Sequence, residues 1–355
     1  MSLKNLFPGI KSRRDFLKVS GAGSMAFFTP SFYRQKREGP GIRMDGSADT
    51  ENFAVGNTPL VQLKNIPEKN SAEIWVKWEG ANPTASMKDR MARGMIDSAE
   101  SKGLLKPGMR IVELTGGSTG SSLAMVGSPR NYSMHFVTTD AISIEKRLTM
   151  EALGATLEVI PSHGKGITPD MVRRSMDRVR ELASEENTYW INQFNNPSNA
   201  EGYRDLGREL LEAGKVDAFV MGVGTGGCIS GVGSVLKNST HSSDVRIVAV
   251  EPAASRNLSG GPAGGHQLEG IGLGFIPETA RLDLIDEIEA VTDREAFELS
   301  RALAKKEGFL AGPTSGANVA VALRVARRLG KGKRVVTLLC DSGLRYLNGN
   351  LFKKE

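Results

Sequence analysis

The feature that most constrains the fold is an alternation of short strand-like segments with longer helix-like segments, which begins at Asn57. Residues 245–250 and 335–339 are apolar and rich in β-branched side chains, as is typical of strands buried in a parallel sheet. Residues 169–184 have a proline at the first position and then apolar side chains at helical spacing. Strands and helices in this order predict an α/β protein built on open, twisted sheets.

The same patterns predict where the other elements lie. Further helices are expected at residues 89–102, where Gly103 ends the pattern, and at 144–153. Strands are expected at residues 58–63, 73–78, 110–114, 134–138, 156–160 and 218–221.

A polar, turn-rich stretch lies near the middle of the chain. Residues 195–199 read NNPSN, a composition that favours a loop over a helix or strand. We expect this stretch to be a hinge between an N-terminal α/β domain, residues 44–195, and a C-terminal α/β domain, residues 196–355. The first strands of the N-terminal domain could also pack on the other domain.

The positive charge of the chain is concentrated at its N-terminus. Residues 1–43 contain nine Lys and Arg but two acidic residues, whereas the whole chain has a net charge of +6. Residues 44–355 therefore carry a net charge of −1, and they show no basic stripe interleaved with aromatic residues. A nucleic-acid partner is not expected. No run of about 18 uninterrupted apolar residues occurs, so no stable membrane span is expected.

The basic N-terminal segment has the form of an export signal. Residues 12–18 read SRRDFLK, and a weakly apolar stretch, interrupted by Gly21, Gly23 and Pro30, follows them. This segment resembles a twin-arginine leader, in which an arginine pair precedes a modestly apolar region. We therefore expect residues 1–43 to be an export signal and linker, and the protein to be periplasmic. A leader that does not function would leave it in the cytoplasm, and the simpler alternative is a disordered basic tail.

A lysine opens a predicted helix directly after a turn. Residues 82–90 read NPTASMKDR, and Lys88 stands at the helix start. The positive end of a helix dipole disfavours a protonated amine, so a lysine there is suited to act as a nucleophile or to form a Schiff base. Taken alone, such a motif more often contains an ordinary surface lysine than a reactive one.

Two loops join a predicted strand to a predicted helix with small residues. Residues 113–122 read ELTGGSTGSS, and residues 222–228 read GVGTGGC. Free N–H groups at such helix starts bind anions such as carboxylate or phosphate. The second loop also invites comparison with the dinucleotide fingerprint GxGxxG, for which Glu251 would supply the later acid. Its string, GxGxGG, departs from that pattern and lies in mid-chain.

The predicted strand at 335–339 runs into residues 340–343, which read CDSG. Ligands of open α/β sheets bind beyond the carboxyl ends of the strands, so the Ser342 hydroxyl is placed to meet one. The two cysteines, Cys228 and Cys340, are too few for a disulfide framework, and we expect both to be small buried residues. Cysteine and histidine spacings do not match a metal-binding pattern, so no metal is expected.

Taken together and in order, these motifs resemble the cysteine synthase and cystathionine β-synthase family of pyridoxal-phosphate enzymes, which have the tryptophan-synthase-β fold, also called fold type II. The resemblance covers nearly all of residues 52–347, because residues 56–61, 193–197, 269–277 and 308–317 also fit the family. It implies two open-sheet α/β domains with pyridoxal 5'-phosphate in the cleft between them, and a homodimer.

The resemblance also implies roles for individual residues. Lys88 would bind the cofactor covalently and move the substrate Cα proton, and Ser342 would hydrogen-bond the pyridine nitrogen. The cofactor phosphate would be held by Gly224, Thr225, Gly226, Gly227 and Cys228. The substrate carboxylate would be bound by Thr115, Gly116, Thr119 and Gln193.

The chain departs from the family pattern in its loops. The family loop TSGNTG reads TGGSTG here, so Gly116 replaces a serine and Ser118 replaces the asparagine that contacts the cofactor. Cys228 replaces the last threonine of the phosphate loop.

The implied reaction is a β-replacement on an O-activated L-serine. O-acetylserine and sulfide, or another thiol, would give L-cysteine and acetate through an aminoacrylate intermediate. The altered loop leaves open a β-elimination of cysteine or serine, and an exported amino-acid-binding protein with weakened catalysis.

Overall fold

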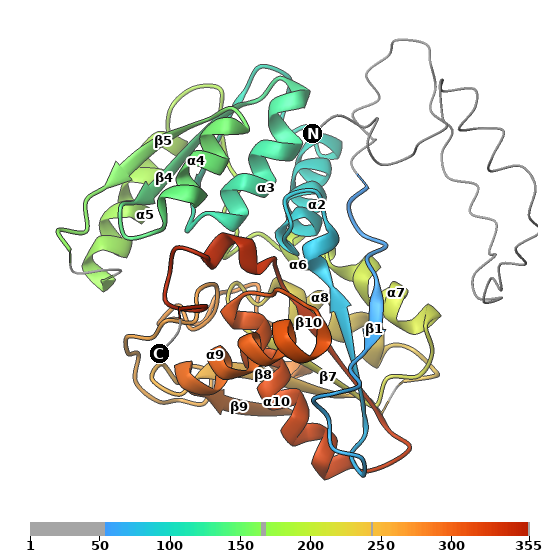
Figure 1. Ribbon diagram of the computed structural model, residues 1–355. Coiled ribbons are helices and arrows are strands. Elements are labelled where there is room, and N and C mark those ends of the chain that lie inside the picture. The colour runs from blue at the N-terminus through green and yellow to red at the C-terminus, as the bar shows by residue number, and fades with distance from the viewer. Residues whose placement is uncertain (1–53, 165–167, 243, 354–355) are drawn as a thin grey trace, which may run out of the picture. The chain divides into compact units, whose positions relative to one another are not determined.

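The computed structural model describes residues 54–164, 168–242 and 244–353. The predicted leader, residues 1–43, lies outside the described residues. The described strands form two sheets, as the predicted α/β class requires. Residues 110–190 supply one sheet, and the strands before and after them supply the other (Figure 1).

The larger sheet has six strands. Their order is β1 (Leu60–Gln62), β2 (Glu73–Trp78), β10 (Arg334–Leu339), β7 (Ala218–Gly222), β8 (Arg246–Pro252) and β9 (Glu287–Val291). All neighbouring pairs are parallel except β1 with β2. The first two strands of the N-terminal part therefore belong to the sheet built mainly by the C-terminal part, while the predicted domain boundary at residue 195 stays a prediction.

The smaller sheet has four parallel strands. Their order is β5 (Ala155–Ile160), β4 (Ser133–Thr139), β3 (Arg110–Leu114) and β6 (Thr188–Trp190). The helices are α2 (Lys88–Ser101), α3 (Ser118–Gly127), α4 (Ile144–Ala152), α5 (Pro169–Ala183), α6 (Ser198–Glu201), α7 (Arg204–Glu212), α8 (Gly227–Lys237), α9 (Asp293–Ala302) and α10 (Pro313–Leu329).

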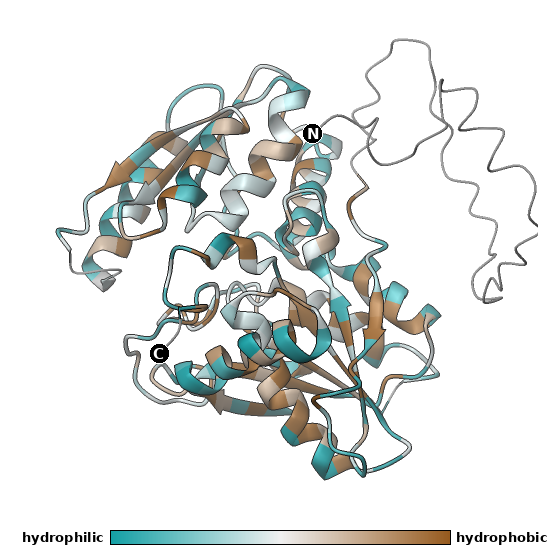
Figure 2. Cartoon of the chain, in the orientation of Figure 1, coloured by the Kyte–Doolittle hydropathy of each residue, from teal (hydrophilic) through white to brown (hydrophobic). Residues whose placement is uncertain are grey.

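Side chains that alternate along the buried strands belong to two separate hydrophobic clusters. In β7, Ala218 and Val220 belong to a cluster with α9 and α10, whereas Phe219 and Met221 belong to a cluster with α8. Successive side chains of a strand point to opposite faces, so both faces of the large sheet are covered. The second cluster continues through α2 and α3 to Phe136 of the small sheet. The strands of the large sheet are accordingly coloured mainly as hydrophobic (Figure 2).

The first predicted strand is shorter than expected. Residues 58–63 were expected to be extended throughout, but β1 comprises only Leu60–Gln62. Thr58 is held by polar contacts instead, since its hydroxyl donates to Glu79 at 2.7 Å and its carbonyl accepts from the Lys77 ammonium at 2.6 Å. Pro59 has no N–H to give to a sheet.

Candidate active site

Lys88 is the first residue of α2, as its place after a turn predicts. The turn brings Ala85 into the left-handed region, with φ of 56°, and the Asp89 carboxylate accepts the Thr84 N–H at 2.7 Å. The Lys88 side chain is half-buried, and its amine has no hydrogen bond or ion pair within the described residues. An amine held in place without a partner is available for chemistry.

The lysine turn pairs with the segment that carries Ser342. The Met87 N–H donates to the Cys340 carbonyl at 2.8 Å, and the Ser342 N–H donates to the Ala85 carbonyl at 3.0 Å. The Ser342 side chain is buried, and its oxygen accepts the Leu344 N–H at 3.3 Å. Its hydroxyl proton has no acceptor among the residues described here, so it can be donated to a ligand. The lysine and the serine, predicted separately, are thus joined through paired backbone.

The predicted phosphate loop follows β7 and leads into α8. The N–H groups of Gly224, Thr225 and Gly226 have no acceptor in the part of the chain that the structure describes. A Cβ at Gly224 would lie 2.0 Å from the Gly270 carbonyl oxygen, and one at Gly227 would lie 1.9 Å from the Asn199 side-chain oxygen. The loop therefore has the unpaired donors and the close approach that an anion cradle needs.

The two cysteines connect this loop to the lysine. Cys228 lies at the start of α8, Cys340 directly follows β10, and both thiols are buried and free. Burial raises the pKa of both thiols, and the nearby Lys88 ammonium acts in the opposite direction on each. The charge of Lys88 thus acts on a residue of the phosphate loop and on the residue that precedes Asp341 and Ser342. Buried thiols with raised pKa are poor nucleophiles at neutral pH.

The predicted substrate loop joins β3 to α3. The Thr115 oxygen accepts the N–H groups of Gly117 and Gly120, each at 3.0 Å, which shapes the loop. The N–H groups of Gly116, Ser118 and Thr119 have no acceptor within residues 54–164 or the other described ranges. Free donors at and just before the start of a ten-residue helix suit a carboxylate.

Gln193 reaches this loop from the segment after β6. Its side-chain oxygen accepts the Thr119 hydroxyl at 2.8 Å, and its side-chain amide donates to the Leu114 carbonyl at 2.8 Å. The structure therefore brings Thr115, Gly116, Thr119 and Gln193 together. It also pairs the turn before Lys88 with the segment that carries Ser342.

Arg345 also contacts this region, although sequence reasoning missed it. Its guanidinium donates to the Ser118 hydroxyl at 3.2 Å and to the Thr84 carbonyl. It thereby connects the serine segment with both the substrate loop and the lysine turn. The only sequence signal was its position three residues after Ser342.

A buried ion network anchors the start of α2. Arg90, two residues after Lys88, contacts Glu79 at 2.7 Å and Glu209 at 2.6 Å, and Lys77 contacts Glu209 at 2.6 Å. The Arg90 side chain is 3% exposed and that of Glu79 is 0% exposed. This network ties the helix that carries Lys88 to β2 and α7.

Replacing Arg90 with methionine should destabilise the fold, because it leaves the buried Glu79 carboxylate without its cation, while Glu209 keeps Lys77. We expect the free energy of unfolding, measured by urea denaturation, to fall by about 3–5 kcal/mol. Arg173→Met is the control: Arg173 pairs with Asp170 on the surface, the side chains being 71% and 58% exposed, and the loss should be about 0–1 kcal/mol. Equal losses in the two variants would contradict a structural role for the network.

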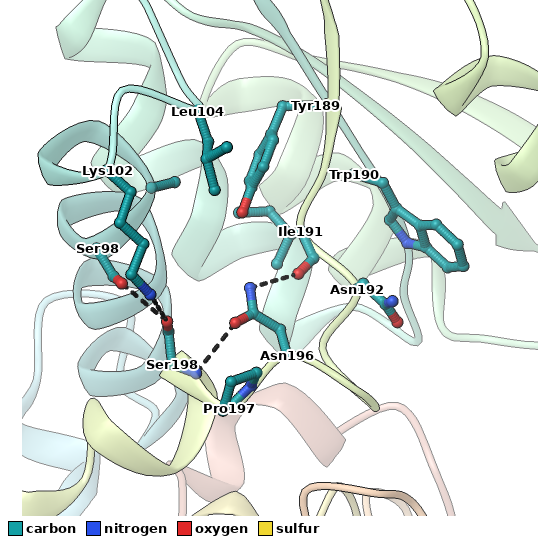
Figure 3. Close-up of a pocket in the computed structure, with 11 residues that line it drawn as sticks. Ser98, Lys102, Leu104, Tyr189, Trp190, Ile191, Asn192, Asn196, Pro197 and Ser198 are labelled. Carbon is teal, nitrogen blue, oxygen red and sulfur yellow. Dashed lines mark hydrogen bonds between the residues drawn. The ribbon is translucent and has the colours of Figure 1, made fainter.

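Other features of the described residues do not compete with this site. A pocket of about 350 Å³ is lined by the end of α2 and by residues 189–192 and 196–198, and none of the predicted site residues lines it (Figure 3). Within the described ranges, no group of three His, Cys, Asp or Glu is placed to hold a metal ion. No helix among the described residues is long and apolar enough to cross a membrane.

The site fits the cofactor that the resemblance implies. Pyridoxal phosphate needs an amine, an anion cradle for its phosphate and a hydrogen-bond partner for its ring nitrogen. Among the described residues, Lys88 supplies an amine without a partner, Gly224, Thr225 and Gly226 supply N–H groups without an acceptor, and Ser342 supplies a free hydroxyl proton.

Comparison with known proteins gives a consistent result. Residues 52–341 match the family described as pyridoxal-phosphate dependent enzyme. A cysteine synthase of Staphylococcus aureus is 43% identical over 302 residues, which cover 84% of this chain and 95% of that protein.

Solved structures agree with the sequence relatives. O-acetyl serine sulfhydrylase isoform 3 from Entamoeba histolytica aligns with a TM-score of 0.80 and 36% identity, covering 86% of this chain and 91% of that chain. A hydrogen sulfide-producing enzyme from Fusobacterium nucleatum aligns with a TM-score of 0.77 and 37% identity, covering 84% of this chain and 99% of that chain.

Proposed function

The chain belongs to the pyridoxal-phosphate dependent enzyme family, and from this premise we propose that it replaces the β-substituent of an O-activated L-serine with sulfide. The first substrate to test is O-acetylserine, with L-cysteine and acetate as the products. This is the activity named for its cysteine synthase relative in Staphylococcus aureus and its O-acetyl serine sulfhydrylase relative in Entamoeba histolytica.

One observation carries this proposal. The lysine turn and the serine segment are paired through the Met87–Cys340 and Ser342–Ala85 hydrogen bonds, of 2.8 and 3.0 Å. This pairing places the turn before Lys88, whose amine has no partner among the described residues, beside the segment that carries the Ser342 hydroxyl. A neutral hydroxyl does not hold that nitrogen protonated as a carboxylate would, which suits β-elimination and replacement.

The chain's own residues account for the other requirements of the reaction. Bound pyridoxal phosphate supplies an electron sink that allows the bonds at Cα and Cβ to break. Lys88 takes the Cα proton and later returns it, and the free N–H groups of Gly116, Ser118 and Thr119 bind the substrate carboxylate. The Cβ–O bond breaks and acetate leaves with its electron pair. The sulfur of hydrosulfide then forms the Cβ–S bond, so the proton count is unchanged.

The proposal is tested with the full chain loaded with pyridoxal phosphate. Cysteine should form from O-acetylserine only when sulfide is present, in step with acetate release. If acetate is released together with pyruvate and ammonia, and no cysteine forms, the reaction is β-elimination and not β-replacement. Binding of amino acids without any turnover would contradict both reactions.

The elimination reaction is supported by a separate observation. Gly116 and Ser118 alter the loop predicted to hold the substrate, and one 37%-identical relative of known structure is a hydrogen sulfide-producing enzyme. Incubation with L-cysteine alone distinguishes the two reactions, because elimination releases sulfide and pyruvate without a second substrate.

Restoring the family serine at position 116 should strengthen substrate binding. A Cβ at Gly116 would meet nothing within 4 Å, so Gly116→Ser adds a hydroxyl without a clash. One added hydrogen bond to a carboxylate should lower KM for O-acetylserine about tenfold, with little change in kcat. Gly117→Ser is the matched contrast: φ is 119° there and a Cβ would lie 2.9 Å from the Lys146 side chain, so KM should rise. If KM is unchanged in Gly116→Ser, the substrate carboxylate does not bind beside residue 116.

We also propose that residues 1–43 direct export and that the enzyme acts as a homodimer. The SRRDFLK motif and the charge of the leader support export, and the family resemblance supports the dimer. Replacing Arg13 and Arg14 with lysine should retain the protein in the cytoplasm during cell fractionation. Light scattering on the purified protein should give twice the mass of the chain. Unchanged fractionation of the lysine variant would contradict export, and the mass of a single chain would contradict the homodimer.

A further inference from the structure

Glu113 is a buried carboxylate that the proposed chemistry does not use. It lies in β3, two residues before Thr115, and its side chain is 0% exposed. One carboxylate oxygen accepts the Leu114 N–H at 2.9 Å, and the other accepts the Gln193 N–H at 3.0 Å. The second bond joins the strand that leads into the substrate loop to a segment 80 residues later in the chain.

This bond fixes the backbone of a residue that contacts the substrate loop. Gln193 is 5% exposed, and its side chain accepts the Thr119 hydroxyl and donates to the Leu114 carbonyl, both at 2.8 Å. Without the carboxylate, the Gln193 N–H would be buried without an acceptor, which is unfavourable. The segment would shift to find a new partner, and the Thr119 contact would shift with it.

No cation neutralises Glu113 within the described residues. Its strand neighbour on β4 is Phe136, α3 carries no ionisable side chain, and β6 contributes the aromatic residues Tyr189 and Trp190. Several charged groups on the surrounding elements have other partners: Arg110 bonds Glu185, Arg178 bonds Glu158 and Glu181, Asp89 bonds Ser122, Lys146 bonds Glu269, and His135 bonds Thr156 on the opposite face of the sheet. Arg147 of α4, whose Nε has no hydrogen-bond partner among the described residues, makes no ion pair with Glu113. The remaining pairs of α5, Asp170 with Arg173 and Arg174 and Asp177 with Arg180, are exposed.

Burial raises the pKa of the Glu113 carboxyl to about 7, although hydrogen bonds from the Gln193 and Leu114 N–H groups oppose the rise. The group therefore changes charge near neutral pH. A protonated carboxyl has one oxygen that bears a hydrogen, so it is a poorer acceptor for two N–H groups.

We propose that Glu113 is a positioning residue for substrate binding: its ionised carboxylate holds Gln193, and through it Thr119, in the arrangement that receives the substrate carboxylate. Loss of this charge loosens the arrangement, so amino-acid affinity falls as the pH drops through neutrality. The inference rests on the proposed function, because it assigns the substrate carboxylate to this loop.

The direction of the effect separates it from acid unfolding. The folded chain holds this proton more tightly than the unfolded chain does, since the folded pKa lies above the ordinary value for glutamate. Ionisation of this group therefore costs stability as the pH rises toward neutrality, and its protonation does not unfold the protein. Protonation of Glu113 at acidic pH therefore lowers the affinity for the amino acid while it favours the folded state, so a loss of affinity through this group is not caused by unfolding.

The test compares Glu113→Gln with the unaltered chain, both loaded with pyridoxal phosphate. L-alanine is the probe, because it has the amino-acid carboxylate but no β-leaving group, and binding is followed by the visible absorbance of the cofactor. We expect the ratio of Kd values, variant over wild type, to be about tenfold at pH 8.5 and to approach one at pH 6. The titrations of alanine and of the cofactor are common to both proteins and cancel in the ratio. Glu185→Gln, at the other end of the sheet, should give a ratio of one throughout.

A Kd ratio that does not change with pH would overturn the inference, since it would make Glu113 a merely structural residue. If Glu113→Gln does not fold, Thr119→Val gives the same test, because it cuts the contact between Gln193 and the loop. Its ratio should also fall toward acidic pH. A wild-type holoprotein that neither binds alanine nor converts O-acetylserine would contradict the proposed function instead.

Discussion

Replacing Lys88 with alanine should reduce the formation of cysteine by about a thousandfold or more. The Lys88 amine has no partner among the described residues, and the turn before it pairs with the segment that carries Ser342. Loss of one positioned proton-transfer group costs about 10²- to 10⁴-fold in rate, and this lysine is also the predicted attachment point of the cofactor. Turnover with O-acetylserine and sulfide measures the effect.

Lys102→Ala provides the matched control for this prediction. Lys102 follows the last turn of the same helix and lies outside the predicted site, so its removal should leave turnover unchanged. Urea denaturation should give both variants the stability of the wild type, since Lys88 makes no ion pair with any residue that the structure describes. A Lys88→Ala protein that retained normal turnover would assign the chemistry to another residue.

Replacing Gly224 with alanine should weaken cofactor binding by about 10- to 100-fold. The added Cβ would lie 2.0 Å from the Gly270 carbonyl oxygen, and a backbone atom cannot move aside as a flexible side chain can. Forced displacement of this kind costs about 1–3 kcal/mol. The displaced loop would turn its free N–H groups away from the phosphate. Equilibrium dialysis of the apoprotein with pyridoxal phosphate measures the loss.

Gly233→Ala tests whether any added methyl group near this loop has the same effect. Gly233 lies in α8, the helix that follows the phosphate loop. A Cβ at Gly233 would be 3.6 Å from its nearest neighbour, the Ile247 side chain. That is ordinary contact, and alanine in a helix interior is favoured over glycine by about 1 kcal/mol. Cofactor affinity should be unchanged in this variant. If Gly224→Ala also leaves the affinity for pyridoxal phosphate unchanged, the cofactor phosphate does not bind at this loop.

Local patterns in the sequence were sufficient for much of the fold and the site. Strands β2 and β3 match their predicted bounds, because apolar and β-branched runs carry a strong signal over a few residues. The start of α2 at Lys88 and the glycine-rich loops could also be predicted, since turn and helix-start chemistry is set by neighbouring residues.

Long-range pairings could not be predicted from the residues alone. The lysine turn pairs with residues 340–342, more than 250 positions later, and no local pattern encodes that register. The same is true of Glu113 and Gln193, and of Arg345 and Ser118. Strand β1 was overpredicted because the polar contacts of Thr58 with Glu79 and Lys77 prevail over its β-branched side chain.

The most direct test of the central claim is to follow product formation by the purified full chain. The protein should bind pyridoxal phosphate, with a visible absorbance that Lys88→Ala loses or shifts. With O-acetylserine and sulfide it should release cysteine and acetate in equal amounts. A protein that binds no pyridoxal phosphate, or that releases neither cysteine nor pyruvate from any O-activated serine, would contradict the account.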